Sequence, residues 1–194
     1  MIRIDAGVGG ACDPPRMADI RLRPWSESDI DLLHAANTPA MTAHLNGPET
    51  EDEIVERHAR YLRLTATGEA RMFVIEDEAG TALGSIGHWH VVWREEAALE
   101  TGWFVRPESQ GRGVASAALA LLIEDARAHR EGRRFLTAFP GVENPASNGV
   151  CRRNGFILAG TFTEDFRGAE LTVNEWALDL TTQNGVSSPG TPVP

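Results

Sequence analysis

The sequence has only two cysteines, one tyrosine and no long apolar run. Cys12 and Cys151 show neither metal-site spacing nor a C-x-x-C pattern, and Cys12 falls in a segment expected to be flexible, so no structural disulfide is predicted. No stretch of 18 apolar residues occurs, and the first residues lack the charged-then-apolar order of a signal peptide. We therefore expect a cytoplasmic protein without a membrane segment.

Basic residues are also scarce, because 18 of them stand against 28 acidic residues and give a net charge of −10. Nucleic-acid binding is not expected, since phosphates require basic patches. An acidic protein suits a cationic substrate such as an amine, although many soluble proteins are acidic without this purpose.

The length of 194 residues suits one domain with a sizeable core, which we predict over residues 19–180. Residues 1–18 contain glycine and proline without apolar periodicity and are expected to form a flexible arm. Met17 stands just before the first strand-like run and is a candidate for the true translation start. Residues 181–194 are rich in Gly, Ser, Thr and Pro and are expected to form a flexible tail.

Periodicity predicts an α+β domain with a mixed central sheet and about four flanking helices. A helix capped by Ser26 and a second helix with the capping box Thr50-x-x-Glu53 come first. Three strands joined by short connections then predict an antiparallel meander. The expected ranges are strands 20–23, 72–76, 83–92, 97–105, 135–139, 156–163 and 171–179, and helices 26–36, 50–65, 111–129 and 145–154.

The most informative run is Gln110-Gly111-Arg112-Gly113-Val114-Ala115, between a predicted strand and a predicted helix. Unpaired amides at the positive end of a helix dipole bind phosphate, and glycines let a diphosphate approach the main chain. The run lacks the Gly-Lys-Ser/Thr of a P-loop, and a meander precedes it where a dinucleotide fold has a βαβ unit. A glycine turn without a ligand is the alternative.

The spacing Gln-x-x-Gly-x-Ala resembles the pyrophosphate-binding signature of the GNAT acetyltransferases. Residues 144–156, an Asn, a short helix and Gly-Phe, look like the later motif of that superfamily, and residues 100–107 resemble its fourth strand. The opening Ile20-Arg21-Leu22-Arg23-Pro24-Trp25 is similar to the branch that includes ribosomal-protein N-terminal acetyltransferases. These marks span residues 20–180.

The resemblance implies that acetyl-CoA lies in a V-shaped gap between the fourth and fifth strands. Val105 would offer main-chain groups to the pantetheine arm, and Asn144 and Ser147 would contact it from the other side, although Asn144 is also a good helix cap. The run Gln110, Gly111, Arg112, Gly113, Val114 and Ala115 would hold the pyrophosphate. The implied reaction is direct transfer of an acetyl group to a primary amine of a small molecule or protein N-terminus. A homodimer is left open.

An amine attacks a thioester only when it is unprotonated, so the site needs a base and a route to discharge the thiolate. Glu100, on the strand that ends at the cofactor, is the candidate base, with an ion-pair partner or solvated residue as the alternative. Cys151 stands where the family usually has a tyrosine acid, and the only tyrosine, Tyr61, lies elsewhere. Cys151 is either an acid for the thiolate or a small buried apolar residue.

Other polar residues leave the acceptor open. His88 and His90 share a strand face and are expected to line the amine pocket, and no metal is predicted because a third ligand is missing nearby. The acidic residues Glu49, Glu51, Asp52 and Glu53 could attract a cation or only solvate a helix N-terminus. Two rival functions are an acyl-CoA sensor without catalysis and the transfer of a longer acyl group such as succinyl.

Overall fold

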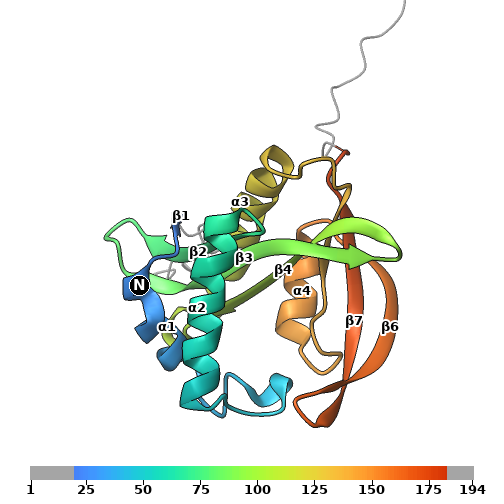
Figure 1. The fold of residues 1–194 in the computed structure, drawn as a ribbon. Coiled ribbons are helices and arrows are strands. Elements are labelled where there is room, and N and C mark those ends of the chain that lie inside the picture. The colour runs from blue at the N-terminus through green and yellow to red at the C-terminus, as the bar shows by residue number, and fades with distance from the viewer. Residues whose placement is uncertain (1–19, 183–194) are drawn as a thin grey trace, which may run out of the picture.

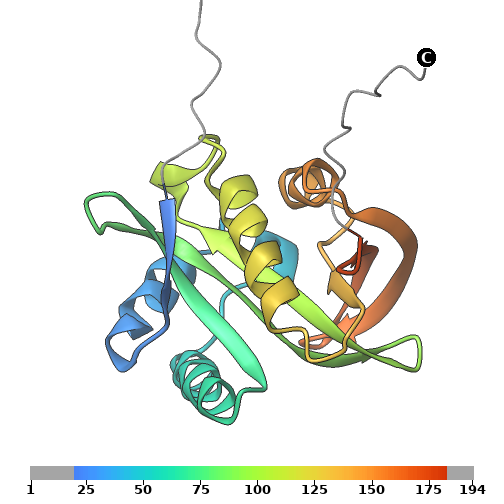
Figure 2. The same ribbon diagram turned by 90° about the horizontal axis from the view of Figure 1, so that it is seen from above.

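The computed structural model describes residues 20–182, and its centre is one seven-stranded sheet of order β1-β2-β3-β4-β5-β7-β6 (Figures 1 and 2). The predictions for residues 1–18, Met17 and residues 183–194 lie outside the described residues. The strands are β1 (Ile20–Pro24), β2 (Ala70–Asp77), β3 (Ala82–Trp93), β4 (Glu96–Val105), β5 (Phe135–Ala138), β6 (Ile157–Phe166) and β7 (Ala169–Asp179). The helices are α1 (Ile30–Ala36), α2 (Glu51–Thr67), α3 (Val114–Ala128) and α4 (Pro145–Arg153).

The predicted α+β class and antiparallel meander are confirmed, whereas several element bounds differ, among them two helix starts and the ends of β2, β6 and β7. α3 begins at Val114, later than predicted, because Gly113 has a left-handed φ of 81° that no helix interior allows. The segment after Ser26 first forms a short 3₁₀ turn (Glu27–Asp29) and only then α1. The capping box of Thr50 and Glu53 is present as predicted.

The sheet is covered on both faces. One core lies under α3 and α4, and the other lies under α1 and α2 (Figure 2). Side chains alternate along a strand, so neighbouring residues of β4 face different cores. Leu99 and Val105 pack toward α3, whereas Phe104 packs toward α2. This alternation decides which residues of β4 can reach each side of the site.

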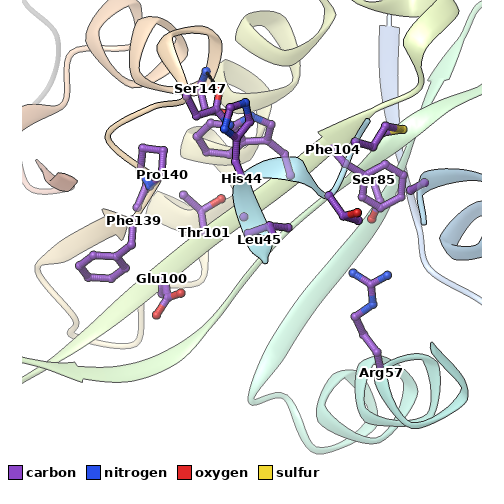
Figure 3. A pocket seen from close by; sticks show the side chains of 18 of the residues that line it. His44, Leu45, Arg57, Ser85, Glu100, Thr101, Phe104, Phe139, Pro140 and Ser147 are labelled. Carbon is purple, nitrogen blue, oxygen red and sulfur yellow. Dashed lines mark hydrogen bonds between the residues drawn. The ribbon is translucent and has the colours of Figure 1, made fainter. Parts of the chain in front are cut away.

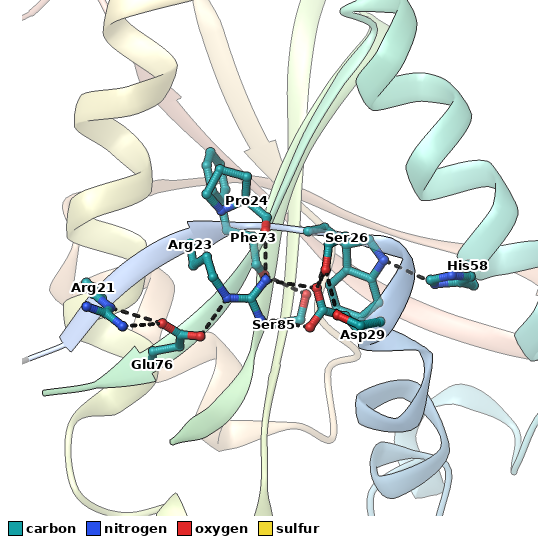
Figure 4. Close-up of polar contacts among 11 residues, drawn as sticks. Arg21, Arg23, Pro24, Ser26, Asp29, His58, Phe73, Glu76 and Ser85 are labelled. Atoms are coloured by element: carbon teal, nitrogen blue, oxygen red, sulfur yellow. Dashed lines mark hydrogen bonds and ion pairs between the residues drawn. The ribbon is translucent and has the colours of Figure 1, made fainter. Parts of the chain in front are cut away.

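A network of ion pairs holds β1 and the start of α1 to the sheet (Figure 4). The Arg23 guanidinium donates to both carboxylate oxygens of Asp29, at 3.0 and 2.7 Å, and to Glu76 at 2.6 Å. Arg21 donates to the other oxygen of Glu76 at 3.0 Å. Both carboxylates are buried, so these partners are required to keep them charged there.

β4 and β5 run parallel but pair at only two positions, Leu99 with Leu136 and Glu100 with Thr137. The Thr137 hydroxyl donates to the Leu99 carbonyl at 3.0 Å and fastens this short pairing. Beyond Ala138 the chain follows β7, because Pro140 has no N–H to donate and its carbonyl accepts from the Asn174 amide at 2.9 Å. The two strands therefore part after Glu100, as the predicted V-shaped gap requires.

Asn148 fixes α4 beside this gap. Its buried Oδ1 accepts from Trp176 Nε1 and from Asn174 Nδ2, both at 2.8 Å. Its Nδ2 donates to the Gly141 carbonyl at 2.9 Å and to the Asn144 carbonyl at 2.7 Å. A fully bonded amide in a buried position ties the helix to β7 and to the loop after β5.

Replacing Asn148 with Ala should lower the free energy of unfolding by about 2–4 kcal/mol, because it leaves the buried Trp176 indole N–H without an acceptor. Urea unfolding followed by fluorescence measures this loss. Thr163→Ala, which removes an exposed hydroxyl that pairs with Thr172, is the control and should change stability little. Equal losses in the two variants would contradict the role given to Asn148.

Candidate active site

A cavity of about 390 Å³ lies where β4 and β5 part (Figure 3). Its lining includes Glu100 and Phe104 from the α2 face of β4, and Thr101 and Trp103 from the α3 face. A cavity touches both faces of one strand only where the neighbouring strand is absent. The cavity therefore passes through the sheet and joins the α3–α4 side to the α1–α2 side.

The glycine turn before α3 presents free amide groups. Within residues 20–182, the N–H groups of residues 111 to 116 donate to no protein acceptor. Gly111 and Gly113 have φ of 70° and 81°, and a Cβ at either position would meet no protein atom within 4 Å. The backbone conformation therefore requires glycine, while the space beside the turn is open. This is the geometry of an anion site at a helix N-terminus.

Gln110 and Val105 are connected in a way that the sequence did not predict. The Gln110 side chain donates to the Val105 carbonyl at 2.9 Å, so this carbonyl already has a partner, and the Val105 side chain is buried in the core. Neither Val105 nor the turn is part of the cavity lining. The Asn154 side chain donates to Ser116 Oγ at 3.1 Å and joins α4 to the first turn of α3.

Asn144 and Ser147 both line the cavity, as their predicted role requires. The Asn144 side chain also caps α4, because its Oδ1 accepts from the Ser147 amide at 3.0 Å. The cap fixes both residues at the gap. Their contact with a cofactor stays a prediction.

Glu100 is half-buried on the α2 face of β4, opposite Trp89. Burial raises the pKa of its carboxyl to about 7, and the charge of Glu164 acts in the same direction, while the neighbouring Trp89 indole acts weakly against both. The carboxyl therefore changes its protonation state near neutral pH, inside the cavity. That property suits a general base.

Cys151 does not reach the cavity. Its side chain has no exposed area and lies in the core between α4 and the sheet, because it is on the inner face of that helix. Burial raises the pKa of its thiol to about 12, which makes it a weak proton donor. Its surroundings are those of a small buried apolar residue, the second of the two interpretations made from the sequence. The acid role stays a prediction without geometric support.

His88 and His90 were expected to line the amine pocket, and the structure corrects this. Both lie outside the cavity lining. His88 Nε2 is 3.0 Å from Asp125 Oδ2 on α3, and Arg133 donates to His90 Nδ1 at 2.9 Å. Their face of β3 points toward α3, away from Trp89 and Glu100. Residues 20–182 contain no cluster of three or more His, Cys, Asp or Glu side chains able to hold a metal, nor a helix able to span a membrane.

Several cavity residues were missed by sequence reasoning. Thr101 is 3% exposed, and its hydroxyl has no hydrogen-bond partner among the described residues. Arg57, Arg60 and Tyr61 reach the cavity from α2. The sequence around Thr101 carries the strand resemblance, but a strand pattern does not reveal that the neighbouring strand is absent on one side. The α2 residues look like one ordinary helix face.

Comparisons with known proteins identify the family of the chain. The model of the Acetyltransferase (GNAT) domain matches residues 19–157. The chain is 36% identical over 149 residues to the ribosomal-protein-serine acetyltransferase of Escherichia coli (strain K12), covering 73% of this chain and 80% of that protein. It is 32% identical over 114 residues to the L-methionine sulfoximine/L-methionine sulfone acetyltransferase of Pseudomonas aeruginosa, covering 58% of this chain and 64% of that one.

Among solved structures, the acetyl transferase of Salmonella typhimurium that modifies the N-terminal serine of ribosomal protein L7/L12 is 26% identical. It superposes with a TM-score of 0.69 and covers 83% of this chain and 95% of that one. The chain belongs to the GNAT acetyltransferase family, as an N-acetyltransferase that uses acetyl-CoA.

The raised pKa of Glu100 predicts a stability change with pH. Between the ordinary pKa of 4.5 and about 7, Glu100 is protonated in the native state but ionised in the unfolded chain, so the free energy of unfolding falls as pH rises. Glu100→Gln should remove this fall, which amounts to at most about 3 kcal/mol. Urea titrations at pH 5 and pH 8 measure it. Glu170 is an exposed carboxyl on the β6–β7 hairpin. The control Glu170→Gln should therefore show the same fall in the free energy of unfolding as the native protein.

Proposed function

We propose that the chain transfers the acetyl group directly to a primary amine, of a small molecule or a protein N-terminus, within the cavity that crosses the sheet. The observation that carries the proposal is the gap between β4 and β5, where Thr101 and Glu100 line one cavity from opposite faces of β4. A thioester entering from the α3–α4 side meets an amine on the α2 side. This arrangement brings both reactants together without an acyl-enzyme.

The proposed cofactor site follows the exposed donors. The diphosphate of acetyl-CoA binds at residues 110–115, where the amides of Gly111, Arg112, Gly113, Val114 and Ala115 have no protein acceptor. The pantetheine arm runs along β4 into the gap, between Val105 on one side and Asn144 and Ser147 at the start of α4 on the other. The buried Thr101 hydroxyl supports this path, because a polar amide in the gap would give it the partner that it lacks.

Glu100 acts as the base in this proposal, directly or through one water. A carboxyl with a pKa of about 7 is partly ionised at neutral pH and is basic enough to take a proton from an ammonium group. The proposal does not assign the acid that protonates the coenzyme A thiolate. The acid role of Cys151 stays a prediction, because its thiol is buried outside the cavity lining. A cytoplasmic location and a homodimer remain predictions.

Gly113→Ala tests the diphosphate site. A Cβ at φ of 81° strains the turn by about 1–2 kcal/mol and disturbs the aligned amides, so the Kd for coenzyme A should rise about tenfold or more. Calorimetric titration measures the Kd. The matched control is Gly132→Ala, which has φ of 84° and equally open space, in the loop after α3. Equal Kd values in both variants would contradict the site, and no binding by the native chain would contradict the enzyme.

Glu100→Gln should lower kcat about 100-fold or more while leaving the Kd of coenzyme A unchanged, because only proton transfer is lost. In the native chain kcat/KM should rise with pH through about 7, as Glu100 ionises. Glu164→Gln removes a neighbouring charge and should move this rise to lower pH, whereas Glu170→Gln should not. Initial rates of thiol release measure kcat and kcat/KM in the native chain and in the three variants. Calorimetric titration measures the Kd of coenzyme A. Coenzyme A binding without turnover of any amine would indicate a sensor.

A further inference from the structure

A second cavity, of about 140 Å³, lies outside the active site. It is bounded by the end of α2, the start of β2, part of β3 and the loop that follows α3. It shares no lining residue with the active-site cavity. His88 and His90, which were expected at the amine pocket, line this cavity instead. The proposed function makes no use of these residues.

His88 has one ring nitrogen that the described part of the chain does not satisfy. The residue is 2% exposed, and its Nε2 lies 3.0 Å from Asp125 Oδ2. Arg71 donates twice to the same carboxylate, both at 2.7 Å, so Asp125 is charged and can only accept. His88 Nε2 therefore carries the hydrogen, and Nδ1 of the neutral ring is an acceptor. This Nδ1 is buried and has no hydrogen-bond partner among the described residues.

Two more hydrogen-bond acceptors belong to the same lining. Thr65 Oγ1, on the last turn of α2, is buried and has no partner among residues 20–182. His129 Nδ1 lies 2.8 Å from the Asp125 carbonyl, which can only accept, so the neutral ring keeps Nε2 as an acceptor. A buried polar atom without a partner is unfavourable, and a ligand that donates to it removes this cost. The cavity therefore favours a ligand rich in donors.

Two helix ends and one carboxylate give this cavity a negative character. α2 and α3 both end here, because their C-terminal caps, Gly68 and His129, are part of the lining. The C-terminal end of a helix dipole is negative and attracts cations. The carboxylate of Glu69 also lines the cavity and forms no ion pair within the described residues. These features favour a ligand with a positive charge.

The other charged groups of the lining are offset by neighbours. Arg71 carries a positive charge, which its ion pair with Asp125 balances. Glu131 carries a negative charge, which Arg133 balances at 3.2 Å. Arg133 also donates to His90 Nδ1 at 2.9 Å, so this nitrogen is not available to a ligand. The unpaired carboxylate and the two helix ends therefore set the charge that a ligand meets.

We propose that this cavity binds a small primary ammonium ion, whose N–H groups donate to His88 Nδ1, Thr65 Oγ1 and the Glu69 carboxylate. An anion would meet lone pairs there. A metal ion would lack ligands, because residues 20–182 hold no suitable cluster of three His, Cys, Asp or Glu side chains. The site is separate from the active-site cavity, and the inference does not depend on the proposed function.

The test titrates the full chain with tert-butylammonium and with its isomer tetramethylammonium, and follows the histidine ring signals by NMR. The two ions have the same atoms and charge, but only the first has N–H donors. tert-Butylammonium should move the His88 and His129 signals and bind about tenfold or more tightly than tetramethylammonium, because charge-assisted hydrogen bonds form only with N–H groups. His44 lines the active-site cavity, so its signal reports binding there.

Two variants test the proposed contacts. Thr65→Val replaces a hydroxyl without a partner by a methyl group of similar size, and Glu69→Gln changes an exposed side chain, so both should keep the fold. Each should raise the Kd of tert-butylammonium about tenfold or more, because each removes a hydrogen bond to a charged group. The matched controls Thr163→Val and Glu170→Gln, on the β6–β7 hairpin, should keep the native Kd.

Several results would overturn the inference. If the His88 and His129 signals do not move, or only the His44 signal moves, this cavity is not an ammonium site. Equal Kd values for the two isomers would refute recognition through N–H donors. A native Kd in both Thr65→Val and Glu69→Gln would refute the assigned contacts. Movement of the His88 and His129 signals by equimolar Zn²⁺ but not by tert-butylammonium would identify a metal site instead.

Discussion

The short pairing of β4 with β5 is the constraint on which the site depends. Two aligned positions and the Thr137–Leu99 hydrogen bond keep the sheet continuous, and Pro140 then directs the chain to β7. A longer pairing would close the opening through which one cavity reaches both Thr101 and Glu100. A shorter one would leave the halves of the sheet without a shared edge. The cavity exists because the pairing stops where it does.

Charge is distributed unevenly around this opening. The chain as a whole carries a net charge of −10, yet the cavity lining includes three arginines, Arg57, Arg60 and Arg167, and only two acids, of which Glu49 is paired with Arg57. Net charge therefore describes solubility better than it describes a pocket. Glu100 is the exception, because burial and Glu164 hold its carboxyl close to neutral and let it exchange a proton at working pH.

Features that depend on neighbours in the chain were predictable. The capping box of Thr50 and Glu53, the cap at Asn144 and the glycine turn before α3 each follow from local backbone chemistry. Residues brought together by packing were not. Arg57 reaches the cavity because α2 crosses the sheet, and Cys151 leaves it because α4 turns that side chain inward. The sequence around Arg57 and Cys151 did not indicate toward which side of its helix each side chain points.

The passage through the sheet also affects the order of events in turnover. Its lining reaches the α3–α4 side through Asn144 and Ser147 and the α2 side through Arg57 and Tyr61. If coenzyme A and the acceptor bind as proposed, coenzyme A and the acylated product leave on opposite sides of the sheet. In that arrangement neither product blocks the departure of the other, so sterics alone impose no fixed order of release.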